Sequence, residues 1–296
     1  MLKNDIKQNS ANILILVSLS IVFLALNSLF CKLALNSEQI DPYSFTLFRL
    51  LFATIMLLII FAIKHKKIVL FKNSNWISSL MLFIYAITFS YAYMDIDAGF
   101  GALLLFGVVQ IVMVVIALFY KEKFSIIKLL GLIISLIGLI YLVYPKNEFE
   151  ISLTHSFLMI IAGIAWALYT IIGKKSTNAL ENTNDNFLKA TIFIVLCYFF
   201  IENKNIFFTY EGLFLAGVSG GITSAIGYMI WYSVLPKLEI MSAGIIQIFV
   251  PVVAIGLSVL FLDELLSFEL IFSTVLIMIG ILLTLFSKQL TKSLYG

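Results

Sequence analysis

Charged residues are scarce in this chain. Asp, Glu, Lys and Arg make up 12% of its 296 residues, Arg49 is the single arginine, and there are only two cysteines, two histidines and four prolines. So little charge excludes an ordinary soluble globular domain. Two cysteines in apolar surroundings give neither a disulfide framework nor a metal-binding spacing, so no metal and no cofactor is predicted. No Walker, Rossmann, His-Glu-x-x-His or Ser/His/Asp pattern is present, which argues against the common enzyme classes.

Apolar residues dominate instead: the chain is 62% hydrophobic, with a mean hydropathy of +1.09. About 20 apolar residues cross the hydrocarbon core of a bilayer. The sequence therefore predicts an all-α integral membrane protein with ten transmembrane helices, at residues 13–35, 45–63, 76–95, 98–120, 125–144, 155–175, 187–205, 212–234, 240–261 and 267–287. The polar N-terminus lacks the cleavage pattern of a signal peptide, so the first helix is expected to remain.

The pattern of the segment 119–142 recurs at 261–284, a spacing of 142 residues. The same shift pairs identical residues: Glu122 with Glu264, Ser125 with Ser267, Gly138 with Gly280, and Lys32 with Lys174. This indicates two five-helix repeats, 1–145 and 155–296, joined by a linker at 146–154. Because five is odd, the second repeat enters the membrane from the opposite side. Such inverted repeats are common in secondary transporters, which hold substrate near the midplane.

Lysines predict the orientation. Fifteen lie in segments on the side of the N-terminus and two in the opposite loops. The positive-inside rule places both termini in the cytoplasm, and we expect a multi-pass protein of a bacterial cytoplasmic (inner) membrane.

Several short motifs carry a family resemblance. They are Arg49 within Leu-Phe-Arg-Leu-Leu, Ala-Trp-Ala-Leu-Tyr-Thr ahead of Lys174, Phe249-Val250-Pro251, and a Glu before a glycine-bearing helix in both halves. With the ten-helix plan, they resemble the EamA-type branch of the drug/metabolite transporter superfamily. The resemblance implies that helices 1, 3, 4, 6, 8 and 9 surround a central cavity and that the protein exports amino acids or related metabolites. Two positions break the symmetry: Arg49 aligns with Thr191, and Pro251 aligns with Val109.

Uncharged polar and aromatic side chains near the middle of those helices are the candidate substrate-binding residues: Asn27, Tyr85, Gln110, Trp166, Tyr169, Thr223 and Gln247. An unpaired amide in hydrocarbon is costly, so such groups must face protein or a watery cavity. Packing between helices is the alternative role. No Lys, Arg, Asp or Glu is expected near the midplane, which predicts a neutral or zwitterionic substrate with an apolar or aromatic part.

Six residues are predicted to have structural or gating roles: Arg49, Asp95, Glu122, Gly221, Pro251 and Glu264. Arg49, near the outer end of the second helix, is expected to pair with Asp95 or Asp97. Glu122 and Glu264 fit hairpins in which a Ser caps the next helix and the carboxylate lies near its positive end, with substrate binding as the alternative. Gly221 suits close helix packing or a hinge, and Pro251 a kink.

The sequence thus predicts a secondary transporter that moves a small amino-acid-like metabolite by alternating access. A membrane-embedded enzyme such as a lipid transferase, and a membrane assembly protein without transport activity, are the alternatives. The expected partners are a solute and the bilayer, and not nucleic acid, because the lysines lie in short loops.

Overall fold

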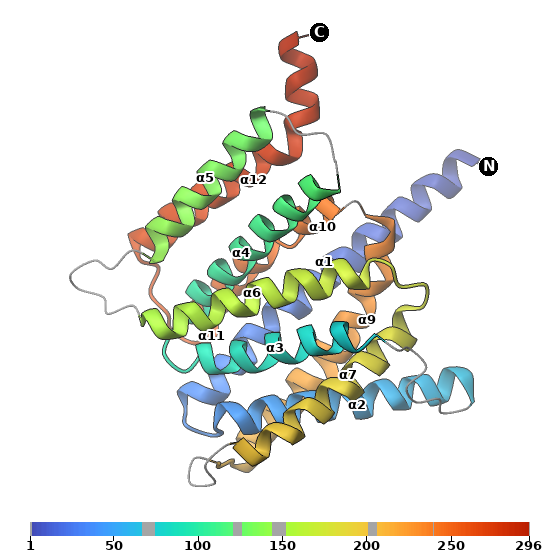
Figure 1. Cartoon of the computed structure of the whole chain (residues 1–296), viewed down its shortest axis with the longest axis vertical. Helices are drawn as coiled ribbons and strands as arrows, with labels where there is room; N and C mark the ends of the chain where they lie inside the picture. The colour runs from blue at the N-terminus through green and yellow to red at the C-terminus, as the bar shows by residue number, and fades with distance from the viewer. Residues whose placement is uncertain are drawn as a thin grey trace.

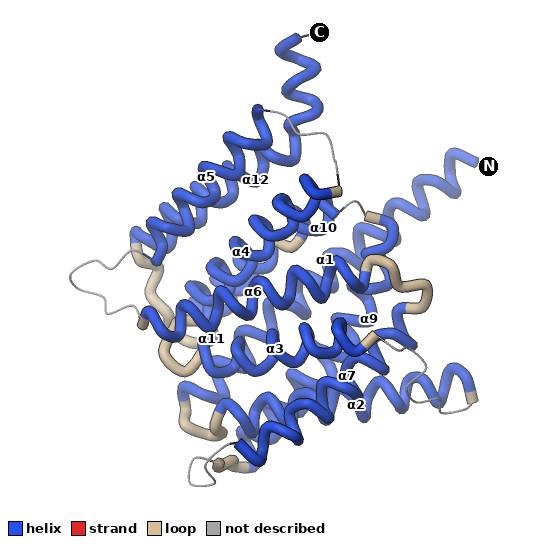
Figure 2. The backbone as a smooth tube through the Cα atoms, in the orientation of Figure 1, coloured by secondary structure: helices blue, strands red, loops and turns tan. Residues whose placement is uncertain are grey.

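The computed structural model describes residues 2–66, 75–120, 126–143, 152–200, 206–238 and 240–295. Nearly all of these residues are helical and none forms a strand; one isolated bridge pairs Ile40 with Phe208 (Figure 2). The helices are α1 (Leu2–Asn36), α2 (Pro42–His65), α3 (Trp76–Ala92), α4 (Ala98–Phe119), α5 (Ile126–Val143), α6 (Leu153–Gly173), α7 (Ala179–Cys197), α8 (Tyr210–Val218), α9 (Ala225–Val234), α10 (Ile240–Ile246), α11 (Phe249–Phe261) and α12 (Phe268–Tyr295).

Candidate membrane-spanning helices are present among the described residues. Five segments are long and apolar enough to span a bilayer: Asn12–Asn36, Pro42–His65, Ala98–Ala117, Leu153–Gly173 and Tyr210–Lys237. Four shorter apolar helices accompany them: Trp76–Ala92, Leu129–Leu142, Phe249–Phe261 and Phe268–Gly280. The prediction of an all-helical, multi-pass membrane protein is therefore confirmed in this form.

Polar residues set the start of several helices. Pro42 is the first residue of α2, and the Asp41 carboxylate accepts a hydrogen bond from the Ser44 amide at 2.9 Å. This arrangement satisfies a donor that has no partner within the helix. Asn75 caps α3 and Thr209 caps α8 in the same way. The seventh predicted helix differs most from its expected bounds: α7 begins at Ala179, because Asn178 caps it through the Glu181 amide, and it ends at Cys197.

Two of the predicted helices are irregular in the middle. The eighth comprises α8, a π-helical turn (Ser219–Ser224) and α9. The ninth is interrupted between α10 and α11. Pro251 has no amide hydrogen for the Gln247 carbonyl, and its ring crowds that oxygen, so the Val250 amide donates to it instead at 3.1 Å. The helix therefore breaks at Gln247, one turn before Pro251, the residue for which a kink was predicted without a position.

The helices form one bundle with a separate pair at its edge (Figure 1). Helix α6 packs against α3 and α4, and α1 packs against α9 and α11. Helices α1 and α6 run in opposite directions, and α5 lies along α12. The repeat-related Gly138 and Gly280 both lie in the α5–α12 contact, where a Cβ at Gly138 would come within 2.9 Å of Ile277.

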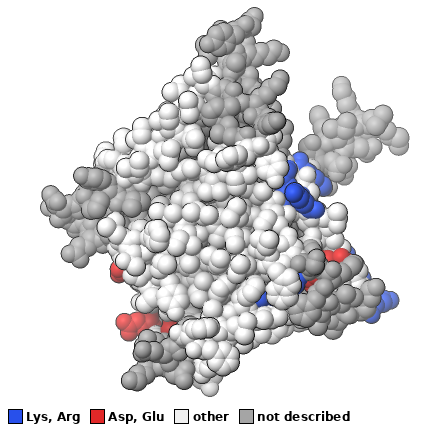
Figure 3. Space-filling view, in the orientation of Figure 1, with Lys and Arg blue, Asp and Glu red and all other residues white. Residues whose placement is uncertain are grey.

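Apolar side chains also cover the outside of the bundle. Leu14, Ile63, Phe157 and Phe214 are each more than half exposed. In Figure 3 the charged atoms gather toward the margins of the described surface, with a broad uncharged area between them. This is the surface that a hydrocarbon environment favours.

Candidate functional site

Arg49 lies at the centre of a buried polar network. Its side chain is 1% exposed. Its Nε donates to Ser224 Oγ at 3.0 Å, and its Nη2 donates to the hydroxyls of Tyr228 at 3.0 Å and Tyr85 at 3.3 Å. The guanidinium also lies 5.1 Å from the ring centroid of Phe89 and 5.5 Å from that of Tyr85. It is therefore held by hydroxyls and ring faces.

Aromatic rings form one wall of the same region. The Trp166 ring lies 4.9 Å from both the Tyr85 and the Tyr228 rings. Its Nε1 donates to Gln247 Oε1 at 2.6 Å, and Gln247 Nε2 donates to the Ala243 carbonyl. The break before α11 thus brings a glutamine amide to the edge of the aromatic wall.

Asn27 connects α1 to the π-helical turn. Its Oδ1 accepts hydrogen bonds from Thr223 at 2.7 Å, Ser224 at 3.0 Å and Ser219 at 3.2 Å. A π turn shifts the register of a helix by one residue and occurs often at functional sites. Here it is accompanied by three hydroxyls directed at one amide oxygen, and Ser224 joins that oxygen to Arg49.

We name this set the central polar cluster: Asn27, Arg49, Tyr85, Trp166, Thr223, Ser224, Tyr228 and Gln247. With α1 taken as its apolar span Asn12–Asn36, α8–α9 as the span Tyr210–Lys237, and α10–α11 as one span, each member lies within about five residues of the middle of its span, which is roughly 7 Å at 1.5 Å per residue. Five of the predicted binding residues therefore meet in the structure: Asn27, Tyr85, Trp166, Thr223 and Gln247.

The other two predicted binding residues, Gln110 and Tyr169, lie at the margins of the central polar cluster. Gln110 is 2% exposed, neither of its amide atoms has a partner among the described residues, and it lies against Gly244 of α10. The Tyr169 ring is 5.7 Å from Trp166 and 5.0 Å from Tyr232. It therefore lies between the central polar cluster and one end of the bundle.

Sequence reasoning missed Tyr228, Ser224 and Phe89. Tyr228 contacts Arg49, Tyr85 and Trp166, yet a tyrosine in an apolar helix resembles any packing aromatic. One available signal was that Ser224 directly follows Thr223 in a glycine-rich, uncharged polar stretch in the middle of a predicted span.

The predicted pairing of Arg49 with Asp95 or Asp97 is wrong. Asp95 Oδ2 lies 3.4 Å from His155 Nδ1 at the end of the bundle, and its side chain is 63% exposed. Arg49 reaches inward because its long side chain extends from α2 across to α3 and α9. The Arg49 guanidinium lies among side chains from the middle of other helices, so the expectation that no charge lies near the midplane is also wrong.

Glu264 differs from its predicted role as well. Its carboxylate accepts from the amides of Ala98 at 2.6 Å and Gly99 at 3.0 Å, so it lies at the start of α4 and not of α12. Ser267 caps α12, as expected, through the Leu270 amide. Glu122 lies outside the described residues. The carboxylate is stabilised at α4 because helix starts carry free amides and positive potential.

Gly221 is not the point of closest helix approach. A Cβ at Gly221 would find its nearest neighbour, Met56, at 3.7 Å. At Gly220 it would lie 3.0 Å from the Arg49 carbonyl carbon and closer still to the oxygen. The π turn changes which glycine faces α2, so a four-residue spacing misidentifies it.

One end of the bundle contains a polar cavity of about 200 Å³. It is lined by groups at the starts of α3 and α7, the end of α6, and α9, among them Asn75, Thr183, Asn186 and Tyr232. Tyr232 and Tyr169 lie between this cavity and Trp166. A row of aromatic rings thus leads from the cavity to the central polar cluster.

The opposite end of the bundle is closed by hydrogen bonds between separate segments of the chain. The Phe207 amide donates to Asp41 Oδ2 at 2.8 Å, and the Asp41 amide donates to the Phe207 carbonyl at 3.1 Å. Glu264 holds α4 at the same end.

Two repeat-related lysines bind carbonyl groups at opposite ends of the bundle. Lys32 Nζ donates to the Tyr93 carbonyl at the end of α3, and Lys174 donates to the Leu238 carbonyl after α9. Both lysines lie where helices end with free carbonyls.

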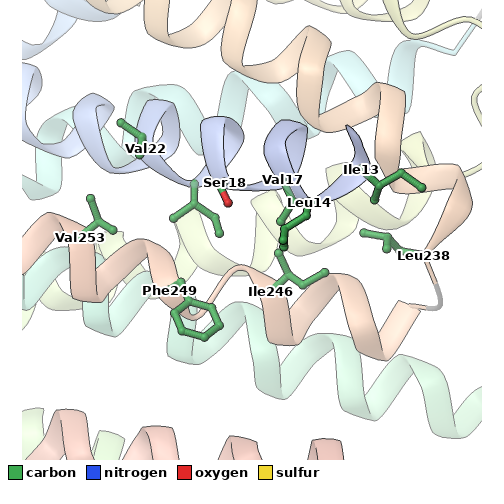
Figure 4. A pocket seen from close by; sticks show the side chains of 10 residues that line it. Ile13, Leu14, Val17, Ser18, Val22, Leu238, Ile246, Phe249 and Val253 are labelled. Carbon is green, nitrogen blue, oxygen red and sulfur yellow. The ribbon is translucent and has the colours of Figure 1, made fainter. Parts of the chain in front are cut away.

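A larger groove of about 580 Å³ runs between α1 and α10–α11 (Figure 4). Its lining is apolar except for Ser18, and it includes the exposed Leu14, Val22 and Phe249. Such a surface suits lipid tails, and none of the predicted binding residues lines it.

Polar groups, aromatic rings and one cation buried at mid-depth in an apolar helix bundle are characteristic of a membrane transporter. The family comparison agrees. The chain belongs to the EamA-like transporter family, whose model matches residues 11–144 and again residues 153–286. The second match begins 142 residues after the first, and the resemblance seen in the sequence is confirmed.

Individual relatives extend over most of the chain. An uncharacterized protein of Pseudomonas aeruginosa is 36% identical over 92% of this chain and 94% of its own length. An uncharacterized transporter of Bacillus subtilis is 23% identical over 86% and 91%. A solved crystal structure shares 16% identity, with a TM-score of 0.65 over 90% of this chain and 98% of the other, which shows a common fold.

Proposed function

We propose that this protein is a secondary transporter that carries a small amino-acid-like metabolite through the central polar cluster by alternating access. The proposed frame is ten spans in two inverted repeats, 1–145 and 155–296, with a linker at 146–154. Three observations support it: the 142-residue spacing of the family matches, the opposite directions of α1 and α6, and the like positions of Lys32 and Lys174.

The observation that carries the proposal is that the hydrogen bonds of the cluster cross between the two halves. Asn27 and Arg49 belong to the first half, whereas their partners Ser224 and Tyr228 belong to the second. A solute bound at such a contact exchanges its bonds with both halves. Motion of one half against the other can then expose it to each side in turn.

The two ends of the bundle fit a state of the transport cycle that is closed at one end and open at the other. The end with Asp41 and Glu264 is closed by hydrogen bonds, and the other end has the polar cavity. With both termini in the cytoplasm of a bacterial inner membrane, as the lysines favour, the cavity faces the cytoplasm. We propose export, for which a cytoplasmic opening loads the solute.

Efflux from proteoliposomes tests the proposal. Vesicles holding the purified protein and the twenty standard amino acids should lose at least one amino acid faster than protein-free vesicles, as measured by mass spectrometry of the outside solution. Absence of protein-dependent efflux would contradict transport of this class. Conversion of a lipid or solute into a new product would favour the enzyme alternative instead.

A pair of tryptophan variants ties the flux to the cluster. Trp166→Phe removes the donor to Gln247 and keeps most of the ring, and an unpaired buried acceptor costs about 1–3 kcal/mol, so we expect efflux to fall roughly fivefold or more. Trp231 is as deeply buried, but its Nε1 has no partner among the described residues. Trp231→Phe should therefore leave efflux unchanged, and an equal loss in both variants would remove the cluster from the mechanism.

A further inference from the structure

Arg49 is a buried cation for which the described residues supply no anion. Its partners are a serine hydroxyl, two phenol hydroxyls and two ring faces. None of these groups is a carboxylate, and Nη1 has no acceptor among the described residues. Removing a charge from water costs several kcal/mol unless an opposite charge and hydrogen bonds compensate.

Three carboxylates at the end of the bundle where α2 begins have partners other than Arg49. Asp41 accepts from the amides of Ser44 and Phe207, and Glu264 accepts from the start of α4. Asp95 is near His155. None of them forms an ion pair with Arg49.

We infer that Arg49 binds the carboxylate of the transported solute, and that the solute is a monocarboxylate with a planar apolar group. This rests on the proposed function and names its substrate class. A guanidinium presents paired N–H groups that match the two oxygens of a carboxylate. Nη1 is the group left for the first bond, and Nη2 shifts from a phenol to the second.

The surroundings limit the rest of the solute. Phe89, Tyr85, Trp166 and Tyr228 present rings around the guanidinium, and a flat apolar group stacks well on such surfaces. Arg49 is the single cation of the central polar cluster. Lys32, the neighbouring buried cation, is held by the Tyr93 carbonyl. A second negative charge on the solute would therefore lack a partner.

Aromatic amino acids and simple aromatic carboxylates share this chemistry. For an amino acid, the ammonium group would bind the amide oxygens of Asn27 and Gln247 in exchange for the hydroxyl and indole donors that they now accept. The inference narrows the expectation of a neutral or zwitterionic substrate to a monocarboxylate, because that expectation depended on an absence of charge that Arg49 contradicts.

Thermal unfolding of the purified protein in detergent tests the inference, since a ligand that binds the folded state raises the unfolding midpoint. The probes are L-phenylalanine, 3-phenylpropionate and L-phenylalaninamide at equal concentration and ionic strength. We expect at least one of the two carboxylates to raise the midpoint and the amide to leave it unchanged. An amide that stabilises as well as the acids, or acids that do not stabilise, would overturn the inference.

Variants assign the effect to Arg49. Arg49→Lys keeps the charge without the fork and should weaken the apparent affinity roughly tenfold. Asn27→Asp places a carboxylate beside Ser224, next to the guanidinium, and should remove the stabilisation even if Arg49 variants fail to fold. Lys32→Gln, the matched control, removes a buried cation outside the cluster and should keep it. A loss in Lys32→Gln equal to that in Asn27→Asp would contradict the assignment.

The result that would contradict this inference differs from the result that would contradict the proposed function. Protein-dependent efflux of L-phenylalaninamide that Asn27→Asp leaves unchanged would keep the transporter and overturn the carboxylate site. Absence of any protein-dependent efflux would contradict both.

Discussion

Replacing Gly220 by alanine should separate α2 from the π-helical turn. The added Cβ would lie 3.0 Å from the Arg49 carbonyl carbon and Cα, and closer to the carbonyl oxygen. These are backbone atoms and cannot rotate away as the end of a side chain can. The two segments must therefore move apart by roughly 1 Å to reach ordinary contact distances of about 3.5–4.0 Å.

The expected cost follows from this movement. Overpacking a well-packed interior costs about 1–3 kcal/mol, which corresponds to an unfolding midpoint lower by roughly 2–10 °C for a chain of this size. The bond from Arg49 Nε to Ser224 Oγ, now 3.0 Å, would lengthen beyond the usual limit of about 3.2 Å. We therefore expect lower transport as well as lower stability.

Gly221→Ala is the matched control, because it makes the same chemical change one residue later. Its nearest neighbour would be Met56 at 3.7 Å, an ordinary contact. Both variants can be followed by thermal unfolding in detergent and by proteoliposome efflux. Equal midpoints for the two variants, or a lower midpoint for Gly221→Ala, would refute the close approach at Gly220.

Three further predictions concern other contacts. Glu264→Ala leaves the first amides of α4 without an acceptor and should cost about 0.5–2 kcal/mol, whereas Glu264→Gln, with one amide oxygen, should lose less; thermal unfolding decides, and equal stability of the two would contradict the capping role. Asn27→Leu removes the acceptor for three buried hydroxyls and should abolish efflux and lower the midpoint, and normal efflux would place the solute path elsewhere. In a cysteine-free background, an impermeant maleimide applied to intact cells should label Glu38→Cys and spare Lys66→Cys, both at exposed positions; the reverse would invert the proposed topology.

The sequence by itself determined the class of protein. Apolar runs of about 20 residues force helices, because backbone groups in hydrocarbon must bond within their own segment. The 142-residue spacing and the motifs around Arg49 and Pro251 indicated the family. Pro251 also allowed a kink in the ninth helix to be expected, since the lost hydrogen bond is a local property of proline.

The tertiary structure decided which side chains meet. Arg49 could not be assigned from its position near the start of α2, because its reach toward Tyr85, Ser224 and Tyr228 depends on how three helices pack. Glu264 caps a helix from the other half of the chain for the same reason. The π turn moved the close contact from Gly221 to Gly220, since a one-residue change in helical register leaves no mark in hydrophobic periodicity. Local propensities predict such helices, whereas contacts between residues more than a hundred positions apart require the packed fold.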